Sequence, residues 1–351
     1  MHWLRITDAV SIAGIGADAL TVRAPLSTAC GPAVFDFDSG HNTRVFGLSG
    51  LTIAGGAQNN RAVHVAYKDT LRLGSVRIRD FTFAPGPVIA GAALWNEDGY
   101  VTIKNCTFSG NGLLGGGSML GGAIWFSRTG AGGAFLAVLN TVFTANLAGT
   151  LGVGGAIAAA GQGQVIIERS SFEGNRANFG AAVALEDSFA TITNTTFSGN
   201  LAGTDGSAIA GGQSPGTLAL LNVTVGFNAA PPGRAAVYSS GQPVLLDNTI
   251  ISDNTGVQCG GTGTFKGDNN ISSDGSCQLS GTGNQEGVSA QLGPLLDNGC
   301  QIPTPDGCTR TRKIAGAPAL DAGNDALCPS TDQRDVARPN GPHCDVGAYE
   351  Y

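Results

Sequence analysis

The sequence predicts an all-β protein: a right-handed parallel β-helix of about eight to ten coils over residues 1–258, followed by a disulfide-bearing C-terminal capping region over residues 259–351. Three observations lead to this prediction. Glycine accounts for 55 of the 351 residues, about twice its ordinary share, which disfavours helices. Hydrophobic residues make up 42% of the chain and can fill a core. The chain also repeats at a period typical of solenoids.

Eight segments of the chain align on one aromatic or aliphatic residue, which we call the anchor. Successive anchors are 25 to 35 residues apart, and this spacing predicts stacked coils. The anchors are Ile53, Phe83, Phe108, Phe143, Phe172, Phe197, Val225 and Ile251.

One predicted strand precedes each anchor. The positions five and seven residues before the anchor are apolar in all eight segments, whereas the position between them varies. This alternation at period two is typical of a strand with one buried face. The position five before the anchor holds Leu48, Ile78, Ile103, Val138, Ile167, Ile192, Leu220 and Leu246.

A second predicted strand lies further upstream in six of the repeats, in strings such as GGAIW and GAAVA. Short strands that recur without a helical run between them can wind into a parallel β-helix. The inward residues of this strand are Leu94, Ile124, Ile157, Val183, Ile209 and Val237. The residues that follow them face outward and are Trp95, Trp125, Ala158, Ala184, Ala210 and Tyr238.

Asparagine recurs three residues before the anchor and three residues after it. Stacked asparagine side chains can bond from coil to coil, and asparagine tolerates the left-handed conformation, so we expect two structural ladders. Three of these residues also begin N-x-T glycosylation sequons, which we interpret as structural. The first column contains Asn105, Asn140, Asn194, Asn222 and Asn248, of which Asn105, Asn194 and Asn222 begin sequons. The second contains Asn111, Asn146, Asn175, Asn200, Asn228 and Asn254.

The strings just described resemble a known repeat. Alternating GGAI-type strings and FxxN strings such as FSGN and FTAN are similar to the repeat of polymorphic outer membrane proteins and related bacterial β-helices. From residue 264 onward, TFKGDNNISSDGSC, GPLLDNG and APALDAGNDALCPSTDQRDVARPNGPHCDVGAYEY resemble the bacterial choice-of-anchor Q domain. That family usually has glycine after the DQR string, where this chain has Asp335. The resemblance implies export, surface association and, in most members, no established activity.

Six of the eight cysteines lie between residues 259 and 344. Their short intervals favour three disulfides and an oxidising compartment. A zinc site is the alternative, but no C-x2-C pair occurs, and the nearest histidine, His343, adjoins only one cysteine. We expect Cys30 and Cys106 to be unpaired. The favoured disulfides are Cys259 with Cys277, Cys300 with Cys308, and Cys328 with Cys344.

The charge pattern bears on partners and location. The net charge is −7, and no stretch is basic enough to follow a phosphate backbone, so we expect no nucleic acid partner. The uncharged run 129–167 is interrupted by polar residues and glycines, so we expect no membrane span. The first residues, MHWLRITDAV, lack the features of a signal peptide, which a truncated start would explain. We expect an extracellular or cell-surface monomer.

An enzyme is the alternative class: a polysaccharide lyase or glycoside hydrolase acting on an extracellular polysaccharide. Hydrolysis needs two carboxyl groups roughly 5 to 10 Å apart, but the acidic pairs 97–98 and 186–187 fall in loops three coils apart. The four histidines show no clustering with acids. Arg77, Arg79 and Lys104 on successive coils could serve a lyase, although we interpret them as solvated strand-face charges. We therefore name no catalytic residue.

A binding function has more support in the outward column. Trp95 and Trp125 on consecutive coils would form a flat platform for a sugar face or a protein partner. The alternative is that the insertion 113–120 covers both rings. We predict a non-enzymatic, adhesin-like or glycan-binding rod whose partner is an extracellular polysaccharide or a host or cell-surface component. The predicted ligand-binding residues are Trp95, Trp125, His64 and Tyr238.

Acidic residues also gather in the C-terminal region beside two arginines. Calcium accepts such oxygen ligands, but we favour ion pairs that attach the cap to the last coil. We expect no cofactor, with structural calcium as the alternative. The residues are Asp321, Asp325, Asp332, Asp335, Asp345, Glu350, Arg334 and Arg338.

Overall fold

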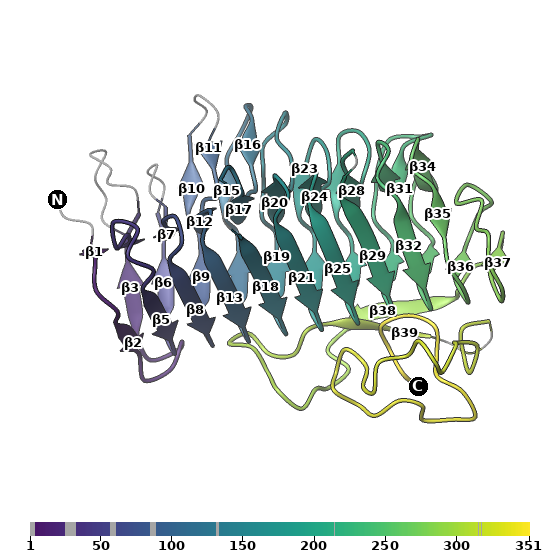
Figure 1. The fold of residues 1–351 in the computed structure, drawn as a ribbon. Coiled ribbons are helices and arrows are strands. Elements are labelled where there is room, and N and C mark those ends of the chain that lie inside the picture. The colour runs from purple at the N-terminus through teal and green to yellow at the C-terminus, as the bar shows by residue number, and fades with distance from the viewer. Residues whose placement is uncertain are drawn as a thin grey trace.

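A computed structural model describes residues 4–24, 33–56, 61–84, 89–130, 133–213, 215–314, 316 and 318–351. These residues form a parallel β-solenoid in which the chain passes through three sheets in turn, here called A, B and C (Figure 1). The sheets contain ten, ten and eleven strands. The predicted all-β class and the parallel β-helix architecture are confirmed.

Each of ten coils contributes one strand to each sheet, and β37 adds an eleventh strand to sheet C. Sheet A consists of β1 (Leu4–Ile6), β4 (Phe35–Phe37), β7 (Val63–Val65), β12 (Leu94–Glu97), β17 (Ile124–Ser127), β20 (Ile157–Ala160), β24 (Val183–Glu186), β28 (Ile209–Gly211), β31 (Ala235–Ser239) and β34 (Val257–Gly261). Sheet B consists of β2 (Ser11–Ala13), β5 (Val45–Ser49), β8 (Thr70–Gly74), β13 (Tyr100–Lys104), β18 (Phe135–Leu139), β21 (Gln164–Glu168), β25 (Phe189–Thr193), β29 (Thr217–Leu221), β32 (Val244–Asp247) and β35 (Phe265–Lys266).

Sheet C contains seven of the eight predicted anchors, all except Phe83. Its strands are β3 (Thr21–Arg23), β6 (Thr52–Ala54), β9 (Arg77–Arg79), β14 (Thr107–Ser109), β19 (Val142–Thr144), β22 (Ser171–Glu173), β26 (Thr196–Ser198), β30 (Thr224–Gly226), β33 (Ile250–Ser252), β36 (Ile271–Ser272) and β37 (Gln285–Glu286). Short two-stranded pairs lie elsewhere: β10 (Thr82–Phe83) with β15 (Gly112–Leu113), β11 (Ile89–Ala90) with β16 (Met119–Leu120), β23 (Arg176–Ala177) with β27 (Leu201–Ala202), and the antiparallel β38 (Leu292–Leu296) with β39 (Thr311–Ile314).

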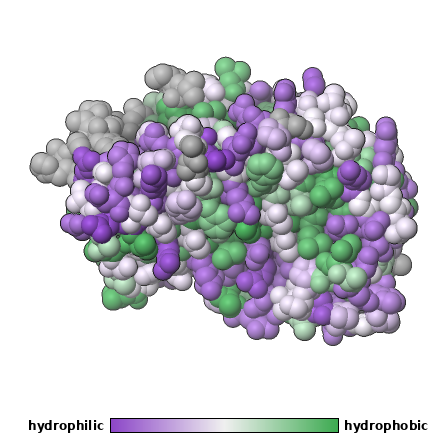
Figure 2. All heavy atoms as spheres, in the orientation of Figure 1, coloured by the Kyte–Doolittle hydropathy of each residue, from purple (hydrophilic) through white to green (hydrophobic). Residues whose placement is uncertain are grey.

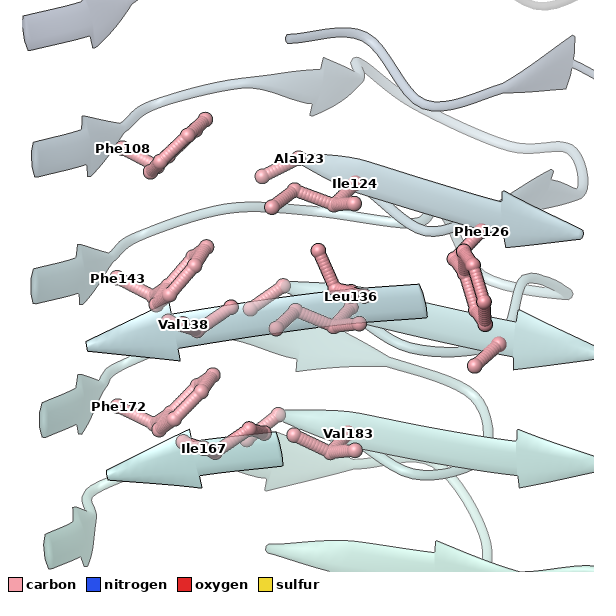
Figure 3. Packing of buried hydrophobic residues seen from close by; sticks show 14 of the residues in the cluster. Phe108, Ala123, Ile124, Phe126, Leu136, Val138, Phe143, Ile167, Phe172 and Val183 are labelled. Carbon is pink, nitrogen blue, oxygen red and sulfur yellow. The ribbon is translucent and has the colours of Figure 1, made fainter. Parts of the chain in front are cut away.

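The core is a set of columns that run along the solenoid. All six predicted inward residues of sheet A are fully buried, and so are the predicted inward residues of the central sheet B strands. Figure 3 shows Phe108, Phe143 and Phe172 one above another at successive anchors. Their ring centroids are 4.9 and 4.8 Å apart, close to the spacing of neighbouring strands. Identical residues therefore stack because the parallel ladder repeats at that same spacing.

The predicted register of the second coil is wrong. The structure pairs Ile78, not Phe83, with both Ile53 and Phe108, and it pairs Leu73 with Ile103. Phe83 instead lies in β10, beside Leu113 of β15. The string FTF at 81–83 has the same alternation as the strand, and its Phe83 lies five residues after the true anchor position, Ile78. Because most other anchors are aromatic, Phe83 resembles an anchor more than Ile78 does.

The ladders also continue past residue 258. Strand β34 pairs with β31, and β35, β36 and β37 extend sheets B and C in parallel. The coils thus reach into the region that the sequence analysis assigns to the cap.

The second predicted asparagine column forms a continuous buried ladder from Asn111 to Asn254. Each Nδ2 donates to the Oδ1 of the next asparagine at 2.8 to 3.0 Å. It also donates to the carbonyl of an anchor-column residue in the preceding coil at 2.9 to 3.0 Å. The ladder satisfies backbone groups at a buried corner that no sheet hydrogen bond reaches.

The first column has a different role. In the structure this column continues through Gly50, Ser75 and Arg169, and all of its residues have φ between 46° and 60°. Asparagine suits this column because its side chain tolerates that left-handed conformation. Only two side-chain bonds within the column occur in the described chain, from Asn140 to Asn105 and from Asn248 to Asn222.

The amides of the first column also bind the C-terminal region. Asn140 donates to the carbonyl of Ile302 and Asn194 to that of Thr331, both at 2.7 Å. Asn222 donates to the carbonyl of Asp345 at 3.1 Å. Two of the three sequon asparagines, Asn194 and Asn222, are therefore buried under this region.

The C-terminal region lies along the outer face of sheet C, as the yellow segment beneath the coils in Figure 1 shows. The predicted attachment to the last coil is wrong, because the ion pairs with the solenoid reach much earlier coils. Arg77 pairs with Asp306 at 2.6 Å, Arg169 with Asp335 at 2.9 Å, and Arg310 with Glu173 at 3.2 Å. A second small core joins the two parts and contains Ile250, Ile271, Ala290, Leu292, Ile314, Ala319, Val346 and Tyr349.

The three favoured disulfides are present: Cys259–Cys277, Cys300–Cys308 and Cys328–Cys344. Cys106 is free and fully buried, and its burial raises the pKa of the thiol to about 12, so the thiol is unreactive. The prediction for Cys30 lies outside the described residues.

The register predicts opposite effects for two neighbouring residues of β25. Ile192 faces the core and is fully buried, whereas Thr191 is exposed. We expect Ile192→Asp to lose roughly 3 to 5 kcal/mol of stability, because it buries an unpaired charge. Thr191→Asp should melt like the parent. Thermal unfolding followed by circular dichroism distinguishes them, and equal melting temperatures would contradict the register.

The ladder predicts a large cost for a single amide. Asn175→Ala removes the acceptor of the Asn146 backbone N–H and a donor to the carbonyl of Phe143. We expect a loss of about 2 to 4 kcal/mol in denaturant unfolding. Asn178→Ala, at a half-buried position in the same coil, is the control and should lose less than about 1 kcal/mol. Similar losses in both variants would remove the special role of the ladder.

Candidate functional site: a groove on sheet A

The outward column of sheet A changes abruptly in side-chain size along the solenoid. The strand register aligns His64, Trp95, Trp125, Ala158, Ala184, Ala210 and Tyr238. The predicted column is thus present. On the two strands that follow the half-buried Trp125 in sheet A, this position is occupied by Ala158 and Ala184. Their small side chains form the floor of a hollow.

One wall of this hollow comes from the connections between sheets C and A. Leu120, Val153 and Phe179 stack there through isolated parallel bridges. The opposite wall comes from Glu186, the last residue of β24, and from the turns that follow the sheet A strands, which include Asp187 and Gln213. We call the resulting cavity the sheet A groove. Its volume is about 380 Å³.

Aromatic rings lie at both ends of the sheet A groove. Trp125 lines one end. At the other, the ring of Phe179 contacts Tyr238 edge to face, with centroids 5.3 Å apart. The insertion 113–120 contributes Leu120 to the groove beside Trp125, which is half-buried. Phe179 is not among the predicted ligand-binding residues, because it lies in a connection outside the aligned strands.

Trp95 does not line this groove. Its ring lies 4.7 Å from His64, and the guanidinium of Arg61 lies 4.6 Å from its centroid. Trp95 and Trp125 are neighbours in the strand register, but only Trp125 lines the groove. Whether His64, Trp95, Trp125 or Tyr238 binds a ligand stays a prediction.

The expectation that no histidine clusters with acids is wrong. His64 Nδ1 lies 2.7 Å from Asp36 and Nε2 lies 3.5 Å from Glu97, on three consecutive coils. His343 Nδ1 lies 2.8 Å from Asp325, a contact that raises the pKa of His343. Asp36 was missed because it precedes the aligned repeats. The imidazole of His64 is almost fully buried.

The carboxylates and cations considered for catalysis do not form one site. The register separates Glu97 from Glu186 by three strand steps of sheet A. Arg77 and Arg79 share β9 of sheet C, whereas Lys104 ends β13 of sheet B in the next coil.

A second cavity of about 460 Å³ lies between sheet C and the segment around Asp306. Arg77 pairs there with Asp306, and Arg310 pairs with Glu173. Burial raises the pKa of Glu173 above its ordinary value. These two ion pairs join the solenoid to the C-terminal region and hold that region on sheet C.

The acidic residues of the C-terminal region form a buried hydrogen-bond network. Asp332 accepts from Arg334 and from three backbone N–H groups, including that of Glu350. Arg338 donates to Glu350 at 3.0 Å and to the carbonyls of Asp345 and Gly347. Across the described part of the chain, no group of three or more acidic, histidine or cysteine side chains could hold a metal ion.

Neither a family model nor a curated relative matches this chain. In the parts of the chain that the structure describes, no helix could cross a membrane. The disulfides are typical of a protein in an oxidising environment.

Asp335 provides a test of the C-terminal network, because its φ is 71° and its carboxylate pairs with Arg169. We expect Asp335→Gly to change stability by less than about 1 kcal/mol, since relief of the left-handed conformation offsets the lost ion pair. Asp335→Ala should be about 1 kcal/mol less stable than the glycine variant. Thermal melting measures both, and equal stability of the two variants would contradict this account.

Proposed function

We propose that this protein is exported and displayed outside the cell, where the sheet A groove binds a saccharide chain without cleaving it. The observation that carries the proposal is the groove itself, in which an alanine floor lies beside a half-buried tryptophan. Tryptophan faces stack on sugar rings, and small floor residues let a flat ring approach the sheet. The volume of about 380 Å³ lies within the ordinary range of ligand sites.

Export and surface display have separate support. Three disulfides occur in the C-terminal region, and such bonds persist in oxidising compartments. The resemblance to polymorphic outer membrane protein repeats and to the choice-of-anchor Q domain points the same way. In the space-filling view, hydrophobic residues form separate patches among hydrophilic ones (Figure 2).

Binding is preferred to catalysis because the groove carries its carboxylates on one wall. Glu186 and Asp187 are adjacent in the chain and leave the opposite wall, Leu120, Val153 and Phe179, without an acid or base. Retaining and inverting hydrolysis both place carboxyl groups on either side of the scissile bond. Release of reducing or unsaturated ends from a polysaccharide would replace this proposal with the lyase or hydrolase alternative.

The test is a screen of soluble polysaccharides followed by affinity measurements with two groove variants. Trp125→Ala should weaken binding about fivefold or more, because ring stacking contributes about 1 kcal/mol. Ala184→Phe should abolish binding by filling the floor. Thr191→Phe on exposed sheet B is the control and should bind like the parent. Unchanged affinity in both groove variants would refute the site.

A further inference from the structure

We propose that the sheet A groove selects a cationic saccharide, one that carries free amino groups. This inference rests on the proposed binding function and narrows its ligand. Among the described residues of the groove lining, Glu186 and Asp187 are the charged ones, and none is a lysine or arginine. A ligand that enters the groove therefore meets a net negative wall.

Neither carboxylate has a partner in the described part of the chain. No hydrogen bond or ion pair engages the side chain of Glu186, which is exposed, or that of Asp187, which is half-buried. Unpaired carboxylates at a cavity wall repel each other and favour an ammonium group between them or beside them.

The equivalent loop three coils earlier offers an internal comparison. There, Glu97 lies 3.5 Å from His64. Asp98 accepts from the backbone N–H groups of Thr129 and Gly130 and from the Thr129 hydroxyl. Asp98 and Asp187 have nearly the same φ, 57° and 54°. In the earlier coil both acidic side chains contact other residues of the protein. In the coil at the groove, the equivalent side chains of Glu186 and Asp187 line the cavity without such contacts.

The aromatic groups of the groove suit the same ligand. Trp125 and Phe179 both line it, and aromatic faces attract ammonium groups through the ring quadrupole. Trp125 and Glu186 are two strand steps apart in sheet A, so one ring of an oligomer can stack on the indole while the amine of a neighbouring ring faces the acidic wall. A uronic acid polymer would place carboxylates against Glu186 and Asp187, which is unfavourable.

The experiment compares two probes with the same sugar backbone: β-1,4-linked glucosamine oligomers, which carry ammonium groups, and their N-acetylated counterparts, which carry neutral amides. The salt dependence of the difference separates the effect of charge from that of the added acetyl group. We expect the parent to bind the amine form about tenfold more tightly at low salt, and the preference to shrink as salt screens the charges. Glu186→Gln combined with Asp187→Asn should remove the preference. Glu168→Gln, which removes one carboxylate on sheet B outside the groove, is the control and should retain the preference.

Three results would overturn the inference. Equal affinity of the parent for both oligomers, lost in Trp125→Ala, refutes charge selection and leaves the binding function intact. Binding of a neutral or acidic polysaccharide in preference to the amine oligomer has the same meaning. Failure of the parent to bind either oligomer or any polysaccharide of the screen refutes the selection and the proposed function together.

Discussion

The structure depends on the stacking of successive coils at a single strand spacing. Parallel pairing in three sheets forces each position of one coil to lie directly above the same position of the next. A residue type that fits one coil then fits its neighbours, so phenylalanines stack with centroids 4.7 to 4.9 Å apart and asparagines bond from coil to coil. A buried polar corner, which would be costly in a single turn, is satisfied by repetition.

Stacking also explains how a solenoid with a uniform core acquires a local site. Inward positions must keep nearly constant volume, whereas outward positions vary without affecting the neighbouring coils. On sheet A the outward column passes from His64 and two tryptophans to three alanines and then Tyr238. The sheet A groove is the space left by this change, and connections of unequal length supply its walls.

The periodic part of the structure could be predicted from the sequence, and the aperiodic part could not. Alternation fixed the inward columns of sheets A and B, and short intervals indicated the three disulfides. The anchor of one coil was predicted at Phe83 and not at Ile78, because Phe83 belongs to a second alternating string that follows the strand. The contact of Asp36 with His64 lay beyond the aligned repeats. The place of the C-terminal region was beyond prediction because no repeat links residues 300–351 to the coils they cover.

The C-terminal region gives the solenoid a mechanical property that stacking alone does not provide. A stack of coils interacts only between neighbours, so it can fray one coil at a time from its end. Here one segment is fastened at Arg77 of β9, at Asn194, at Thr224 and at Asn269 beside β36. These points span eight strands of sheet C. From β9 to β36, a coil cannot separate from its neighbour without breaking attachments to the segment, and a pull along the axis is shared between ladder and segment in parallel. This part of the rod therefore resists extension as one cooperative unit.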